Sequence, residues 1–104
     1  MYIVIFITAA NSEEAQKIGQ RLVQEKLVAC VNIIDNVKSI FWWEQRVDQS
    51  QEVLMILKTK KSMFLKIAKL VKSLHSYSVP EIIALPIVAG QKDYLNWLGD
   101  SVKK

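Results

Sequence analysis

The sequence is poor in glycine, cysteine and histidine, and each scarcity excludes a class of function. The three glycines, Gly19, Gly90 and Gly99, are too few and too scattered to build a phosphate-binding loop or a dinucleotide fingerprint. The single cysteine, Cys30, cannot form an internal disulfide, which suits a reducing compartment. With His75 as the only histidine, no HxxxH or HExxH spacing exists, and one chain has too few nitrogen and sulfur ligands for a structural zinc site.

Long apolar runs and clusters of basic residues are also missing. No stretch approaches the roughly 20 apolar residues needed to span a bilayer, and the apolar start "MYIVIFITAA" lacks the basic residues of a secretory signal. The 14 basic residues are scattered, for a net charge of +4. The segment "VLMILKT" has no aromatic ring on which an RNA base could stack. We therefore expect a cytoplasmic protein with neither a membrane nor a nucleic-acid partner.

The chain does contain many apolar residues for its length. It has 104 residues, which predicts a single domain over 1–104 with a modest core. Apolar residues make up 51% of it, more than one small core can hide. This excess predicts an exposed apolar patch or a subunit interface, and hence a homo-oligomer.

The hydrophobic period alternates along the chain between strand and helix spacing. Residues 2–8 form a continuous apolar run, which predicts a strand buried on both faces, and Asn11 or Ser12 is expected to cap the helix that follows. The expected elements are a strand at 2–8, a helix at 11–27, strands at 28–43 and 46–59, a helix at 63–74, a strand at 79–87 and a helix at 90–104.

This order predicts an α+β fold, a ferredoxin-like βαββαβ sandwich with an added C-terminal helix and a long hairpin between its second and third strands. The first and third strands are the most uniformly apolar, which places them at the centre of the sheet. Pro86 cannot donate to a ladder on both sides, so we expect the fourth strand at an edge.

The candidate site residues lie in "LHSYSVPE", at 74–81, and in "VACVN" around Cys30. His75 follows a helix and is expected to cap its C-terminus, where the helix dipole favours an imidazolium. Glu81 opens an apolar strand, and a buried carboxylate needs a basic partner, for which Lys58 is the nearest candidate. Cys30 alone is typical of a small buried apolar residue. Thiolate and imidazole both suit copper, however, so a metal site shared between subunits remains open.

The stretch "FWWEQR" places three aromatic rings at the connection of the hairpin. Tryptophan is enriched at protein interfaces, because its ring tolerates one apolar and one wet side. We interpret these rings as a subunit interface, with a platform for stacking a substrate as the alternative.

Five segments together resemble one family. They are "EKLVACVN" at 25–32, "FWWEQ" at 41–45, "EVLMILKT" at 52–59, "LHSYSVPE" at 74–81 and "YLNWL" at 94–98. In this order and spacing the chain resembles the CutA family of divalent-cation tolerance proteins. The resemblance implies a ferredoxin-like protomer that forms a tight homotrimer through its long hairpins, with an architecture similar to the PII signalling proteins. It also implies a link to tolerance of copper and other divalent metals, with no established reaction.

The resemblance also implies which residues form the sites. Positions that the family favours are occupied by Cys30, Trp43, Glu44, Glu52, Lys58, Thr59, His75, Tyr77, Pro80, Glu81, Tyr94 and Trp97. Of these, the family associates His75 with metal. We predict a metal site that draws on His75, Cys30 and Glu81. The predicted cleft between subunits contains Lys58, Tyr77, Glu52, Trp43 and Trp97.

The chain departs from the family pattern at four positions. Ser76 stands where the family has proline, and Gln45 stands where it has glycine. If the turn needs positive φ, Gln45 costs about 1–2 kcal/mol. Ile7 and Leu74 occupy positions where some members have a cysteine and a second histidine, and both absences weaken the metal site.

Four functions are compatible with these observations. The first is a copper or divalent-cation protein that uses His75, with Cys30, in clefts of a trimer. The second is a PII-like sensor that binds a small anionic metabolite through Lys58. The third is an enzyme in which Tyr77, His75 and Glu81 transfer protons, although nothing fixes a substrate or an orienting partner. The fourth is a module that only trimerises. We expect no catalysis and no organic cofactor.

Overall fold

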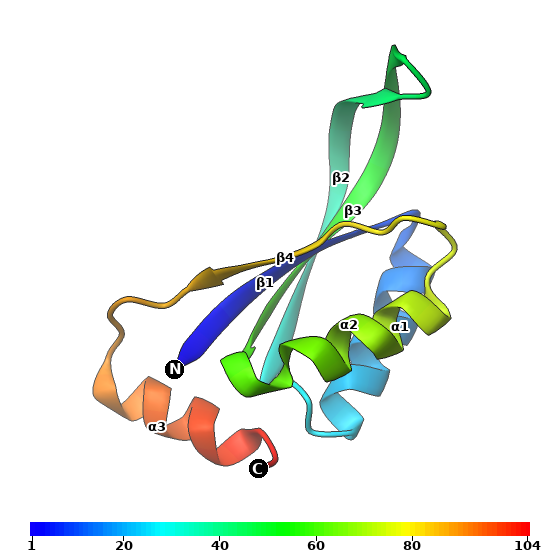
Figure 1. Cartoon of the computed structure of the whole chain (residues 1–104). Helices are drawn as coiled ribbons and strands as arrows, with labels where there is room; N and C mark the ends of the chain where they lie inside the picture. Colours follow the sequence, from blue (N-terminus) through cyan, green and yellow to red (C-terminus); the bar gives the residue numbers. More distant parts are fainter.

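The computed structural model describes residues 1–104 and contains one four-stranded antiparallel sheet (Figure 1). The elements are β1 (Tyr2–Ala9), α1 (Ser12–Gln24), β2 (Cys30–Trp43), β3 (Arg46–Lys60), the 3₁₀ turn η1 (Lys61–Met63), α2 (Phe64–Leu74), β4 (Ile82–Pro86) and α3 (Lys92–Ser101). The strands lie in the order β2-β3-β1-β4. The predicted ferredoxin-like order, with its C-terminal helix, is confirmed.

The edge position of the fourth strand is also as predicted. β4 pairs only with β1, where Pro86 lies opposite Ile3. The strand is shorter than the expected 79–87, because it begins at Ile82 rather than before Pro80. The helix at 11–27 ends at Gln24, and its cap is Asn11, whose side chain accepts a hydrogen bond from the Glu14 N–H at 2.8 Å.

The core lies between one face of the sheet and the helices. Alternate residues of β1, among them Ile5 and Ile7, are fully buried, and Met55 of β3 lies beside them. They pack in one cluster of 17 buried apolar residues that includes Ile18 of α1 and Ile67 of α2. Figure 1 shows α1 and α2 on this face and α3 at the end of the sheet near the N-terminus.

The second face of the sheet is apolar and only partly covered in the single chain. Val4 and Phe6 of β1 are half-buried there, and Ile83 and Leu85 of β4 are 51% and 49% exposed. The expectation that residues 2–8 are buried on both faces therefore does not hold within one chain. The physical reason is that α1 and α2 pack on the opposite face, while α3 reaches only the end with Tyr2 and Cys30.

The hairpin of β2 and β3 extends beyond the rest of the sheet as an arm (Figure 1), and a β-bulge marks its base. Ile34 pairs with Leu54, but Val37 pairs with Glu52, so β2 contains one residue more than β3 at this point. Asn36, with φ of 64°, lies in the bulge. Because side chains alternate along a strand, the extra residue moves the odd-numbered residues of β2 beyond it to the face of Glu52.

A two-residue turn ends the arm. Trp43 pairs with Arg46, and the two residues between them, Glu44 and Gln45, have φ of 51° and 67°. Positive φ at both positions defines the type I′ turn, which favours glycine at the second position. The turn therefore does need the positive φ that makes glutamine unfavourable at position 45.

We predict that Gln45→Gly raises the free energy of unfolding by about 0.5–1 kcal/mol. Relief of the left-handed strain outweighs the added flexibility of the unfolded chain. Urea denaturation at fixed protein concentration measures the change. Gln49→Gly is the matched control, because Gln49 lies in the extended strand β3 opposite Ile40 and glycine there is destabilising. Stabilisation by both variants, or by neither, would contradict the explanation.

Candidate functional site

Several of the predicted site residues line a groove of about 700 Å³ between the arm and the segment 77–81. One wall is the face of the arm that carries Glu52 and, beyond the bulge, the odd-numbered residues of β2. There Phe41 lies opposite Asp48, and Ser39 lies opposite Ser50. Trp43 lies further out on the same wall. Sequence reasoning placed Phe41 among the aromatic rings of the hairpin but not in this groove, because the bulge that turns it to this face was not predicted, and it missed Asp48 altogether.

The opposite wall begins at His75, which is buried at the end of α2. Its backbone N–H donates to the Val71 carbonyl at 2.8 Å, so His75 is the C-terminal cap of α2 through its backbone, although its imidazole does not bind the helix carbonyls as the prediction implied. Its ring is also engaged at both nitrogens. The Tyr77 N–H donates to Nδ1 at 3.0 Å, so Nε2 carries the hydrogen and donates to the Thr8 carbonyl at 2.7 Å. The imidazole therefore links the turn to β1, and neither ring nitrogen is free to bind a metal.

Glu14 of α1 anchors the same turn. Its carboxylate accepts hydrogen bonds from the N–H groups of Ala10 at 2.9 Å and of Ser76 at 2.7 Å. Burial acts to raise the pKa of Glu14, but these hydrogen bonds outweigh it and lower the pKa overall. Sequence reasoning did not single out Glu14 as a site residue. The spacing from Asn11 to Glu14, which is that of a capping box, could have signalled a second role, although the Glu14 carboxylate binds the Ala10 and Ser76 N–H groups instead of the Asn11 N–H.

Tyr77 closes the base of the groove. Its hydroxyl donates to Oε2 of Glu52 at 2.8 Å, and its ring centroid lies 4.8 Å from that of His75. Burial and the neighbouring Glu52 carboxylate raise the pKa of Tyr77 to about 12. Glu52 itself is only 8% exposed, and the one ion pair of the chain, between Arg21 and Glu25, lies elsewhere.

The predicted pairing of Glu81 with Lys58 is wrong. Glu81 is exposed and lines the groove, because β4 begins only at Ile82 and leaves the carboxylate in water. Lys58 lies six residues along β3 from Glu52, about 20 Å away at the usual rise of a strand. Its ammonium group donates to the side chain of Asn32 instead.

Cys30 and Trp97 also lie at the far end of the sheet. Cys30 pairs with Lys58 across the β2–β3 ladder, and its sulfur lies 3.8 Å from the Tyr94 hydroxyl. Burial, and then the contact with Cys30, raises the pKa of Tyr94. The Tyr94 ring lies 5.4 Å from that of Trp97.

The predicted site residues thus form two groups within one chain. Trp43, Glu52, Tyr77 and Glu81 line the groove. Lys58, Cys30 and Trp97 lie at the other end of the sheet, and His75 lies behind Tyr77. No three histidine, cysteine, aspartate or glutamate side chains come close enough to hold a metal ion. One chain therefore does not assemble the predicted metal site.

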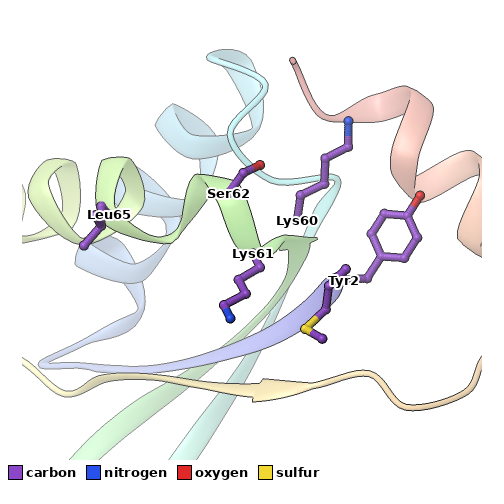
Figure 2. A pocket seen from close by; sticks show the side chains of 6 residues that line it. Tyr2, Lys60, Lys61, Ser62 and Leu65 are labelled. Atoms are coloured by element: carbon purple, nitrogen blue, oxygen red, sulfur yellow. The ribbon is translucent and has the colours of Figure 1, made fainter.

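A second hollow, of about 590 Å³, lies at the N-terminal end of β1 (Figure 2). Lys60 and Lys61 line it, but Figure 2 shows the two side chains extending in different directions. The Lys60 ammonium is turned to the Val102 carbonyl, at 3.4 Å. The lysines therefore do not converge on a ligand. Elsewhere in the chain, none of the helices has the length and hydropathy needed to cross a membrane.

We predict that Tyr77→Phe lowers the free energy of unfolding by about 1–3 kcal/mol, because the buried Glu52 carboxylate loses its only hydrogen-bond donor. The pKa of Tyr77 is raised, so its contribution to stability is complete below the ordinary value of 10.0 and is lost as the pH rises towards about 12. Urea denaturation measures the change in the free energy of unfolding, and the phenolate absorbance as a function of pH measures the pKa of Tyr77. Tyr77→Phe must remove the absorbance step near pH 12, and Tyr2→Phe must retain it; the reverse result would contradict the assignment.

Known proteins match this chain over nearly all of its residues. The family described as "CutA1 divalent ion tolerance protein" matches residues 3–101. The divalent-cation tolerance protein CutA of Archaeoglobus fulgidus is 44% identical over 103 residues, which cover 99% of this chain and 100% of that protein. The chloroplastic protein CutA 1 of Oryza sativa is 41% identical over 98% of this chain, which spans only 58% of the rice protein.

The fold agrees with the sequence match. The structure of the divalent cation tolerance protein (Cut A1) from Thermus thermophilus superposes with a TM-score of 0.97 at 44% identity, over 99% of this chain and 100% of that one. CutA1 from Oryza sativa gives a TM-score of 0.96 at 41% identity, over 99% and 94%. The resemblance found in the sequence is therefore confirmed, and the chain belongs to the CutA1 divalent ion tolerance family.

Proposed function

We propose that the protein acts in divalent-cation tolerance as a homotrimer that binds a divalent cation, copper foremost, in clefts between its subunits. The observation that carries this proposal is the charge of the groove. Asp48, Glu52 and Glu81 line it, and no lysine, arginine or histidine does. A hollow with this lining attracts cations and repels anions.

Association of subunits is supported by the surface of the single chain. The second face of the sheet is apolar, whereas an antiparallel sheet that faces water normally carries polar side chains there. On the outer face of the arm, Ile40 is 67%, Trp42 74% and Val47 59% exposed. Apolar patches of this kind mark protein interfaces. The number of three subunits rests on the family resemblance.

The separation of the predicted metal ligands favours a site that uses more than one subunit. Glu81 is free to bind a cation, whereas His75 would first have to break its hydrogen bond to Thr8 or to Tyr77. Cys30 is half-buried at the other end of the sheet, so its thiol would come from a neighbouring subunit. In this arrangement Glu81 is the primary ligand, with Cys30 and His75 as soft ligands for copper.

The other functions considered from the sequence have less support. A PII-like sensor of an anionic metabolite needs basic groups at its ligand, but Lys58 lies at the far end and the groove has none. An enzyme that uses His75 as a base needs a free ring nitrogen, and both are occupied. We therefore propose a binding role without catalysis. A cytoplasmic location is part of the proposal and agrees with the single unpaired thiol.

The test is native mass spectrometry of chelator-stripped protein during titration with copper. We expect a trimer that binds one ion per chain, with affinity reduced about tenfold or more by Glu81→Gln and by Cys30→Ser, since each removes a ligand. Glu13→Gln, which removes an exposed carboxylate from α1, is the matched control and must leave the affinity unchanged. A trimer that stays free of copper would refute the metal site, and a monomer would refute the shared cleft.

A further inference from the structure

Part of the positive charge of the chain gathers on one helix of the fold. Residues 53–80 include six lysines and no aspartate or glutamate. Lys66, Lys69 and Lys72 lie on α2, and Lys61 lies in the 3₁₀ turn directly before it. Residues three and four positions apart share a face of a helix. Lysines that are separate in the sequence therefore come together on one surface of the structure.

These four lysines and Leu65 form an exposed surface, which we call the lysine face. All four lysines are exposed, and Leu65 is 80% exposed between them. Leu65, Lys69 and Lys72 have the i, i+4, i+7 spacing of a single helical stripe. Figure 2 shows that Lys61 and Leu65 extend in the same direction, whereas Lys60 extends in the opposite one. The lysine face is thus a basic strip with one apolar side chain inside it.

No acidic group of the chain neutralises the lysine face. The one ion pair of the chain lies at the end of α1, between Arg21 and Glu25. The exposed residues of α1 carry charges of both signs, such as Glu13 and Lys17, so the imbalance is a property of α2. A surface with charge of a single sign attracts partners of the opposite sign. The lysine face therefore favours an anionic partner.

The spread of these charges suits a macromolecule better than a small anion. At the usual rise of a helix, the distance from Lys61 to Lys72 is about 16 Å. The hollow of about 590 Å³ adjoins the strip, and Leu65 lines it together with Met1, which is 78% exposed. A partner can place an apolar side chain in this hollow while its acidic groups lie along the lysines.

Among anionic macromolecules, an acidic helix of another protein fits the lysine face best. Single-stranded RNA is bound through stacking on aromatic or arginine side chains, and this face has neither. A helix that binds a membrane presents a broad apolar face to it, but α2 turns Ile67 and Val71 into the core. Two helices that pair combine an apolar seam with opposite charges along its edges. Leu65, with lysines before and after it, provides one half of such a pair.

We propose that the lysine face docks an acidic amphipathic helix of a partner protein. The apolar side chains of this helix contact Leu65 and the hollow beside it, and its carboxylates pair with Lys61, Lys69 and Lys72. The face stays accessible when subunits associate through the apolar second face of the sheet, because α2 packs on the opposite face (Figure 1). An assembly with several such faces binds a multivalent partner more tightly. This proposal goes beyond the proposed function, since it uses neither the acidic groove nor a metal ion.

The test is fluorescence anisotropy of a labelled peptide, titrated at low salt with the assembled protein. The probe is a synthetic helix of about 20 residues that has a leucine stripe with glutamates on both sides. The same peptide with glutamines in place of its glutamates is the neutral control, and poly-glutamate is the control for charge alone. We expect the acidic helix to bind saturably, about tenfold or more tightly than either control, because it alone offers both an apolar stripe and charge. Added sodium chloride should weaken it.

Substitutions locate the binding surface. The double variant Lys69→Gln with Lys72→Gln should weaken binding about fivefold or more, since it removes two ion pairs, and Leu65→Gln should weaken it several-fold through loss of the apolar contact. All three positions are exposed, so these variants should fold as the wild type does. Lys92→Gln, which removes an exposed lysine from α3, is the matched control and must leave the affinity unchanged.

Three outcomes would overturn the proposal. The first is no binding of the acidic helix, and the second is an equal loss of binding in Lys92→Gln and in the double variant, which would mean attraction by net charge alone. The third is tighter binding of phosphatidylserine vesicles or of single-stranded RNA than of the peptide, which would assign the face to a membrane or to RNA. Copper titration of the same variants separates the two proposals. No lysine lines the groove, so the double variant must bind copper as the wild type does, whether or not it binds the peptide.

Discussion

The one extra residue in β2 is the constraint on which the rest of the site depends. Without the bulge between Ile34 and Val37, the side chains of Phe41 and Trp43 would point to the outer face of the arm, and the groove would lose its aromatic wall. The bulge also allows the two long strands to leave the sheet while their ladder continues to the turn. The extra residue thus gives the two faces of the hairpin different surfaces. The outer face is apolar, and the other face forms the acidic and aromatic groove.

The second wall depends on hydrogen bonds from a few polar side chains to the backbone groups of a short turn. Glu14 and His75 each accept or donate two hydrogen bonds, and together they hold the turn that carries Tyr77. Buried polar groups are stable only when they are paired in this way. Glu52 obeys the same rule at the base of the groove, where the Tyr77 hydroxyl donates to its carboxylate.

Most of the fold could be predicted from the sequence, because apolar periodicity reports element type and Pro86 reports an edge strand. The helix cap at Asn11 and the order of the strands follow from local chemistry of this kind, whereas the type I′ turn was left open, because Gln45 stands where glycine is the usual signal. The candidate site was predicted only in part. Tyr77, Glu52, Trp43 and Glu81 do meet, but Lys58 does not join them, since periodicity does not reveal the bulge or the point at which β4 begins.

The hydrogen bond from Ser76 to Glu14 joins residues 62 positions apart in the sequence. Closing a loop of this length has a large entropic cost, and nothing local repays it until α1 and α2 have both docked on the sheet. The wall of the groove should therefore order only after both helices have docked. Once formed, it can open at a free energy below that of the sheet while the core stays intact, because a few polar contacts hold it.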